Sequence, residues 1–175
     1  APLQTGIVKN CCSNSVDFKT HQPYKASMEA TQPHSPTVNA CRTHEICAGH
    51  RVFGHESKCS KIHGHNYSFE FHCNAEKLDK VGRVIDFSVI KSTLCRWLED
   101  HWDHQFLVWE HDPIASSLEV ADPDGVVRVP FNPTAENLAE HVLTVVAPEL
   151  LADTGVRLQR LVLHETKKCW VEAQL

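Results

Sequence analysis

The sequence has no long apolar run, no excess of positive charge and no dinucleotide-binding glycine motif. Its 175 residues carry a formal net charge of −5, and none of its apolar segments reaches the roughly 18 residues that a membrane span needs. A nucleic-acid partner and a membrane partner are therefore not expected. Because no GxGxxG motif is present, an external nicotinamide or flavin reductant is not expected either.

Paired CxxC motifs are also missing, although cysteine is abundant. The eight cysteines form no even framework of spacings. With 42% apolar residues, a chain of this length can build a core without disulfide bonds. The first twenty residues lack the continuous apolar segment of a secretory signal. We therefore expect free thiols, a reducing environment and a cytoplasmic location.

The first 39 residues are polar and follow neither a helical nor a strand period. They are rich in Ser, Thr, Asn, Pro and His, a composition that predicts a disordered tail. The only methionine of the chain is Met28. One hypothesis is that the natural chain starts there and that the residues before it are not native. The folded domain is expected over 40–175.

The remainder of the chain predicts an α+β domain. Strict alternation over 62–73 and looser alternation over 40–52 predict a β-hairpin. Helices are expected over about 87–100, after Asp86 as N-cap, and over about 132–150. A second hairpin over 156–175 completes a four-stranded antiparallel sheet with both helices on one face, in the order ββααββ. A short "VVRV" strand is expected in the loop between the helices, and the free sheet edges favour oligomerisation.

Thirteen histidines are the most unusual feature of the composition. His63 and His65 are two residues apart on a predicted strand, so both imidazoles leave the same face, roughly 7 Å apart. His50 ends the preceding strand, and a hairpin would bring it alongside His63. Three neutral imidazoles with an open fourth position are typical of a catalytic zinc site. Alternative third ligands are His44, His55 and His72.

Cys59 lies in the loop before this histidine pair, between Lys58 and Lys61. It could be a fourth, structural zinc ligand, an inert thiol or a reactive thiolate. Nearby cations lower the pKa of a thiol, which favours the thiolate. A thiolate beside a metal ion can take a proton from a metal-bound substrate.

At this point the motifs resemble those of a known family. The segment "AGHRVFGHESKCSKIHGHNY" resembles the signature of the 6-pyruvoyltetrahydropterin and 6-carboxytetrahydropterin synthase family. Further along, "GRVIDFSVIK", "WDHQFL", "PTAEN" and "VLHET" resemble later segments of that family, in the same order, over about 40–175. Val108 departs from the family's DH-x-x-LN pattern, in which Asn is usual.

The resemblance implies a fold, an assembly and a set of site residues. It implies the tunnelling fold, in which trimers close their sheets into a barrel and pair into hexamers, with active sites between subunits. It also implies that 7,8-dihydroneopterin triphosphate is the substrate, chelated to Zn²⁺ by its side-chain hydroxyls. The implied residues are the zinc ligands His50, His63 and His65, the catalytic Cys59 with the dyad Asp103 and His104, the pterin anchor Glu165, and Thr134 and Glu136 near the pterin. Arg51, with Lys58 and Lys61, supplies positive charge for the polyanionic substrate.

The branch of the family is indicated by one spacing. Three residues separate Cys59 from His63, which resembles the 6-carboxy branch of queuosine and deazapurine biosynthesis. That branch releases acetaldehyde as well as triphosphate. Two alternatives are the 6-pyruvoyl branch of the tetrahydrobiopterin pathway and a non-catalytic zinc-binding oligomer.

Overall fold

The computed structural model describes residues 37–175 of the chain. The expectations for residues 1–36, which include a disordered tail and a start at Met28, lie outside the described residues. Regular structure begins with a strand at Ala40. The cysteines of the described range are free thiols, as predicted.

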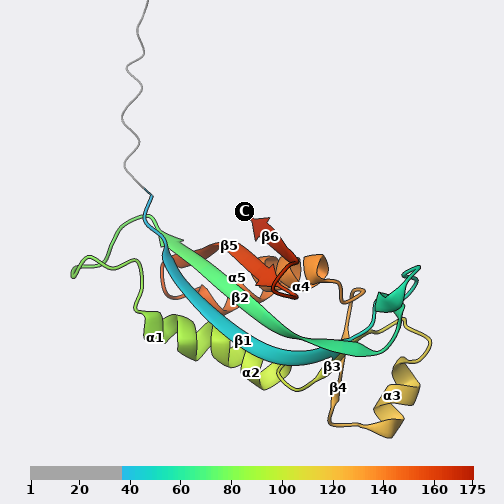
Figure 1. Ribbon diagram of the computed structural model, residues 1–175. Coiled ribbons are helices and arrows are strands. Elements are labelled where there is room, and N and C mark those ends of the chain that lie inside the picture. Colours follow the sequence, from blue (N-terminus) through green and yellow to red (C-terminus); the bar gives the residue numbers. More distant parts are fainter. Residues whose placement is uncertain (1–36) are drawn as a thin grey trace, which may run out of the picture. The chain divides into compact units, whose positions relative to one another are not determined.

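A curled, mixed sheet of six strands organises the domain (Figure 1), in the spatial order β4-β3-β1-β2-β5-β6. The predicted count of four was wrong. The four antiparallel strands are present, but two short strands add to the sheet in parallel beyond β1. The strands are β1 (Ala40–His50), β2 (His63–Ala75), β3 (Phe106–Trp109), β4 (Val126–Val129), β5 (Val156–His164) and β6 (Trp170–Gln174).

The long β1–β2 hairpin follows from the alternation of β2. Tyr67, Phe69 and Phe71 are buried on the face that carries the core, whereas Glu70 and His72 lie on the opposite, open face. A shift of one residue would move every apolar side chain to the open face, so this pattern fixes the register. In that register His50 pairs directly with His63.

Two helical segments pack on the core face, and each contains one π-helical turn. The first comprises α1 (Phe87–Ile90), a π turn (Lys91–Cys95) and α2 (Arg96–His101). The second comprises α4 (Ala135–His141), a π turn (Val142–Val146) and α5 (Ala147–Leu151). Asp86 caps α1, as predicted, by accepting a hydrogen bond from the Ser88 amide at 2.8 Å. A further helix, α3 (Ala115–Ala121), was not predicted and lies in the expected loop.

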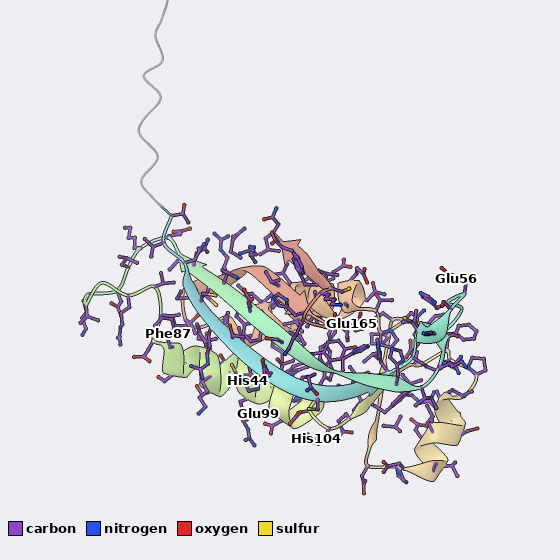
Figure 2. All side chains as sticks on the ribbon, in the orientation of Figure 1. His44, Glu56, Phe87, Glu99, His104 and Glu165 are labelled. Atoms are coloured by element: carbon purple, nitrogen blue, oxygen red, sulfur yellow. The ribbon has the colours of Figure 1, made fainter. Side chains whose placement is uncertain are left out.

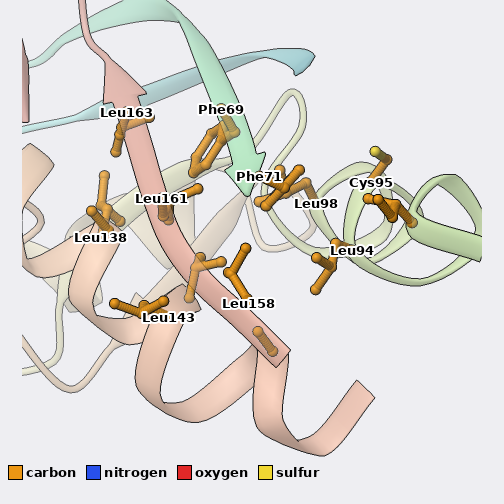
Figure 3. Close-up of a cluster of buried hydrophobic side chains, with 14 of the residues drawn as sticks. Phe69, Phe71, Leu94, Cys95, Leu98, Leu138, Leu143, Leu158, Leu161 and Leu163 are labelled. Carbon is orange, nitrogen blue, oxygen red and sulfur yellow. The ribbon is translucent and has the colours of Figure 1, made fainter. Parts of the chain in front are cut away.

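One hydrophobic cluster joins the sheet to both helical segments (Figure 3). Aromatic rings of β2 meet leucines of the helices and of β5. The cluster includes Phe69, Phe71, Leu94, Leu98, Leu138, Leu143, Leu158, Leu161 and Leu163. This cluster therefore fixes the base of the β1–β2 hairpin, and the polar ends of β1 and β2 extend beyond it.

Among the described residues, no helix is long and apolar enough to cross a membrane.

Candidate metal centre and active site

Three imidazoles meet where β1 ends and β2 begins. The ring centroids of His50 and His63 are 4.4 Å apart, and those of His65 are 5.2 Å and 5.0 Å from them. One ring nitrogen from each residue lies within 4.8 Å of the other two. The predicted group of three histidines is thus confirmed as a set that could hold a metal ion.

The backbone orients two of these rings. The Nδ1 atom of His50 lies 2.7 Å from the Pro133 carbonyl oxygen, and the Nδ1 atom of His63 lies 2.7 Å from the Lys61 carbonyl oxygen. Because a carbonyl oxygen only accepts, each Nδ1 carries the proton and each Nε2 keeps its lone pair. This is the outer support that metal-binding histidines usually have.

The environment favours the neutral form of two of the three imidazoles. Burial lowers the pKa of His50 to about 4 and also lowers the pKa of His65. The Nε2 atom of His50 is buried and has no hydrogen-bond partner among the described residues. Three imidazole nitrogen donors, one of them an unsatisfied buried atom, fit a zinc ion.

A glycine allows the two strands to approach each other at this point. A Cβ atom at Gly64 would lie 2.9 Å from the Ala48 carbonyl oxygen, a distance that real Cβ atoms do not adopt. Because β1 lies against Gly64, the position between His63 and His65 has no room for a side chain.

Glu165 follows β5 and faces the imidazoles. Its Oε1 atom is 3.6 Å from Nε2 of His50 and 3.6 Å from Nε2 of His65, too long for a hydrogen bond. The sequence predicted only a role in pterin binding for this residue. The sequence does not predict the contact of Glu165 with two of the three histidines. That contact depends on the register of β5 on β2, which a local sequence pattern does not reveal.

Two cavities adjoin at Glu165. The larger, of about 1130 Å³, is lined by His63, His65 and His104 among others. The smaller, of about 390 Å³, is lined by Cys59, Thr134 and Glu136. Glu165 lines both. The structure therefore brings most of the predicted site residues around one carboxylate.

Cys59 and Thr134 are held by local structure. Cys59 is half-buried in a single 3₁₀ turn (Lys58–Ser60), and its carbonyl oxygen accepts a hydrogen bond from the Val52 amide at 2.8 Å. Thr134 is the N-cap of α4 and accepts from the Asn137 amide at 3.3 Å. Its hydroxyl proton is still available to a ligand.

Asp103 and His104 form a pair at the larger cavity. Oδ2 of Asp103 lies 3.0 Å from Nδ1 of His104, and Oδ1 accepts from the Cys47 amide at 2.8 Å. Partial burial of the Asp103 carboxyl disfavours its charged form and by itself would raise its pKa. The hydrogen bonds from Cys47 and His104 together have the larger effect, so the pKa of Asp103 is lowered. His104 has a φ of 59°, a left-handed conformation that is costly for a non-glycine residue.

The pair does not join Cys59 within one chain. His104 is 80% exposed and lines the larger cavity, whereas Cys59 lines the smaller one. Figure 2 shows His104 near the end of α2 and Glu165 near β5, and both residues line the larger cavity. A dyad that works with Cys59 would therefore have to come from elsewhere.

Two residues that the sequence analysis missed hold the loop after β1. Asn132 accepts from the Phe53 amide at 2.9 Å and donates to the Phe53 carbonyl at 2.8 Å. Asp112, whose side chain is fully buried, lies with Oδ2 3.0 Å from Nε of Arg51, in a charge contact without hydrogen-bond geometry. Arg51 lines neither cavity, and its role toward phosphate stays a prediction. The sequence offers only two signals for these contacts. Asp112 precedes a proline, and Asn132 precedes the "PTAEN" segment.

The buried Asp112 carboxylate should be important for stability. Asp112→Asn should lower the free energy of unfolding by about 3 kcal/mol, because it leaves the Arg51 guanidinium without its partner. The matched control is Glu119→Gln, which removes one partner of the exposed pair with Arg128 and should cost clearly less, because solvent screens that pair. Urea unfolding of both variants provides the measurement. Equal losses would contradict a special role for the buried pair.

Comparison with known proteins agrees with this fold. The family model described as 6-pyruvoyl tetrahydropterin synthase matches residues 39–174. A 6-carboxy-5,6,7,8-tetrahydropterin synthase of Rickettsia felis is 35% identical over 136 residues, 77% of this chain and 99% of that protein. An uncharacterized protein from Wolinella succinogenes has a similar structure, with a TM-score of 0.70 and 22% identity over 80% of this chain and 99% of its own. For the Caenorhabditis elegans 6-pyruvoyl tetrahydropterin synthase the TM-score is 0.58, with 20% identity over 80% and 96% of the two chains.

The α+β fold and the sequence match define the class, which is that of the pterin synthases. The chain belongs to the 6-pyruvoyl tetrahydropterin synthase family. At identities of 22% and 20%, the two solved structures support the fold alone.

Proposed function

We propose that the chain is a zinc-dependent 6-carboxy-5,6,7,8-tetrahydropterin synthase of queuosine and deazapurine biosynthesis, acting in the cytoplasm. It converts 7,8-dihydroneopterin triphosphate and one water molecule into 6-carboxytetrahydropterin, triphosphate and acetaldehyde, with the water supplying the second carboxyl oxygen. The observation that carries the proposal is the group of three imidazoles beside Glu165, with the cavity of Cys59 adjoining it. The name of the Rickettsia felis relative and the short spacing from Cys59 to His63 support the 6-carboxy branch.

The metal would be held by His50, His63 and His65, each through its available ring nitrogen. When bound, a zinc ion supplies a Lewis acid that acidifies the hydroxyl groups of a substrate. Because backbone carbonyls already orient His50 and His63, little reorganisation of these two rings accompanies binding.

Proton transfer is assigned to Cys59 and to the Asp103–His104 pair. Cys59, as the thiolate, takes a proton from the side chain of the substrate and returns it at a later step. The Asp103 carboxylate accepts from Nδ1–H of His104, which leaves Nε2 of that ring free to exchange a proton. An internal redistribution of this kind reduces the pterin ring without an external reductant.

Substrate binding is assigned to Glu165, Thr134, Glu136 and Arg51. The Glu165 carboxylate lies where the two cavities adjoin, so it can accept hydrogen bonds from the amino and ring N–H groups of a pterin. Thr134 and Glu136 line the smaller cavity beside it. Arg51 contributes positive charge toward the triphosphate, together with the exposed Lys58 and Lys61.

Replacement of Glu165 separates substrate binding from metal binding. Glu165→Gln should weaken pterin binding by about 2–4 kcal/mol, because an amide offers one acceptor and one mismatched donor. Zinc content should be unchanged. Triphosphate release from 7,8-dihydroneopterin triphosphate gives KM and kcat, and Glu140→Gln on the exposed face of α4 is the matched control. No release by the unaltered chain would refute the function, whereas an unchanged KM in Glu165→Gln would refute only the role of Glu165.

A further inference from the structure

A second set of metal-ligating side chains lies on the open face of the sheet. Cys41 and His72 are direct cross-strand partners in β1 and β2, and Glu70 precedes His72 by two residues on the same face. The Nε2 atom of His72 is 3.6 Å from Cys41 Sγ and 3.6 Å from Glu70 Oε2. One ligand atom from each residue lies within 4.8 Å of the other two.

This group shares no ligand with the three imidazoles of the candidate metal centre, although Glu70 lines the larger cavity together with His63 and His65. Alternation along β2 directs His63 and His65 to the core face and directs Glu70 and His72 to the open face. The three side chains stand on paired strands, which hold ligands more rigidly than loops do.

Neighbouring residues orient the group. Nε2 of His164 lies 2.9 Å from Oε1 of Glu70, so it fixes one carboxylate oxygen and leaves Oε2 for a ligand. Arg160 lies 3.1 Å from Nε2 of His72 and also donates to Glu172 at 2.7 Å. A cation that binds His72 displaces the Arg160 guanidinium from the imidazole. The guanidinium then remains paired with Glu172.

The donor set indicates the class of cation. A thiolate, a carboxylate and an imidazole together suit zinc-like divalent ions, whereas magnesium and calcium prefer oxygen ligands alone. The thiol of Cys41 gives up its proton to solvent when its sulfur binds the cation. The thiolate and carboxylate then balance the two positive charges.

We propose that Cys41, Glu70 and His72 form a second binding site for a divalent transition-metal ion, which links β1 to β2 on the open face. Binding of an ion to the folded state alone stabilises that state. The site therefore strengthens the hairpin that carries the catalytic histidines, independently of the catalytic reaction.

Cobalt(II) is the probe, titrated into the full chain after metal removal with a chelator. The unaltered chain should bind about two equivalents, one of them with a thiolate-to-cobalt charge-transfer absorption. Cys41→Ser and, separately, His72→Gln should each lose this absorption and one equivalent. Thr43→Ala, on the same face of β1, is the matched control and should keep both.

Two further variants separate this site from the proposed catalytic site. His63→Ala should lose one equivalent and keep the thiolate absorption, and Cys59→Ala should keep the absorption as well. If Cys41→Ser retains the absorption and both equivalents, or if the unaltered chain binds one equivalent without the absorption, the second site does not exist. Circular dichroism verifies that each variant is folded.

Discussion

Replacing His63 or His65 by alanine should remove zinc and turnover together. Two imidazoles cannot hold a zinc ion tightly while it also binds substrate. Metal affinity should fall by more than about 100-fold, because even the loss of a hydrogen-bond partner of a ligand costs up to that much. Metal analysis and the rate of triphosphate release measure the two effects.

The matched control for these variants is His111→Ala. His111 is exposed and lies outside the group of three, so its loss should change neither zinc content nor rate. Near-native circular dichroism is expected for all three variants, because the histidines lie beyond the hydrophobic cluster. Full zinc content and full rate in both His63→Ala and His65→Ala would disprove the ligand assignment.

The second prediction with a large expected effect concerns Cys59→Ala and His104→Ala. Each variant should be nearly inactive alone, and the two assembled together should be active. In one chain, His104 is exposed at the larger cavity and Cys59 lies in the smaller one. We infer that Cys59 of one subunit works with His104 of another, in a homo-oligomer built as a hexamer of two trimers. Cys59→Ala should retain zinc, and it and His104→Ala should each lose about 10²–10⁴-fold in rate.

Co-refolding the two variants should restore part of the activity. With random mixing, about one quarter of the interfaces combine an intact Cys59 with an intact His104. The control is Cys59→Ala mixed with the double variant Cys59→Ala/His104→Ala, which forms no intact interface. Light scattering measures the assembly. A monomer, or mixed oligomers without any recovery, would exclude a shared active site.

Much of the hairpin and of the histidine group could be predicted from the sequence. The period of two along β2 sets which residues share a face, and a hairpin of this pattern brings His50 alongside His63. The caps at Asp86 and Thr134 follow from local hydrogen bonding, which a short segment can specify.

The parts that could not be predicted depend on long-range packing. Strand β3 joins β1 through only two residue pairs, beginning with Gly49 and Phe106, and four residues show too little periodicity to reveal it. The buried contact of Asp112 with Arg51 joins segments sixty-one positions apart in the chain. The left-handed backbone of His104 opposes the local preference of a histidine and is stabilised by the Cys47 carbonyl, which accepts from the His104 amide at 2.6 Å.

Product analysis tests the proposed function most directly. The zinc-loaded chain is incubated with 7,8-dihydroneopterin triphosphate, and the products are identified by mass spectrometry. We expect 6-carboxytetrahydropterin, with acetaldehyde and triphosphate released in equal amounts. Formation of 6-pyruvoyltetrahydropterin without acetaldehyde, or full zinc occupancy with no turnover, would contradict the assignment.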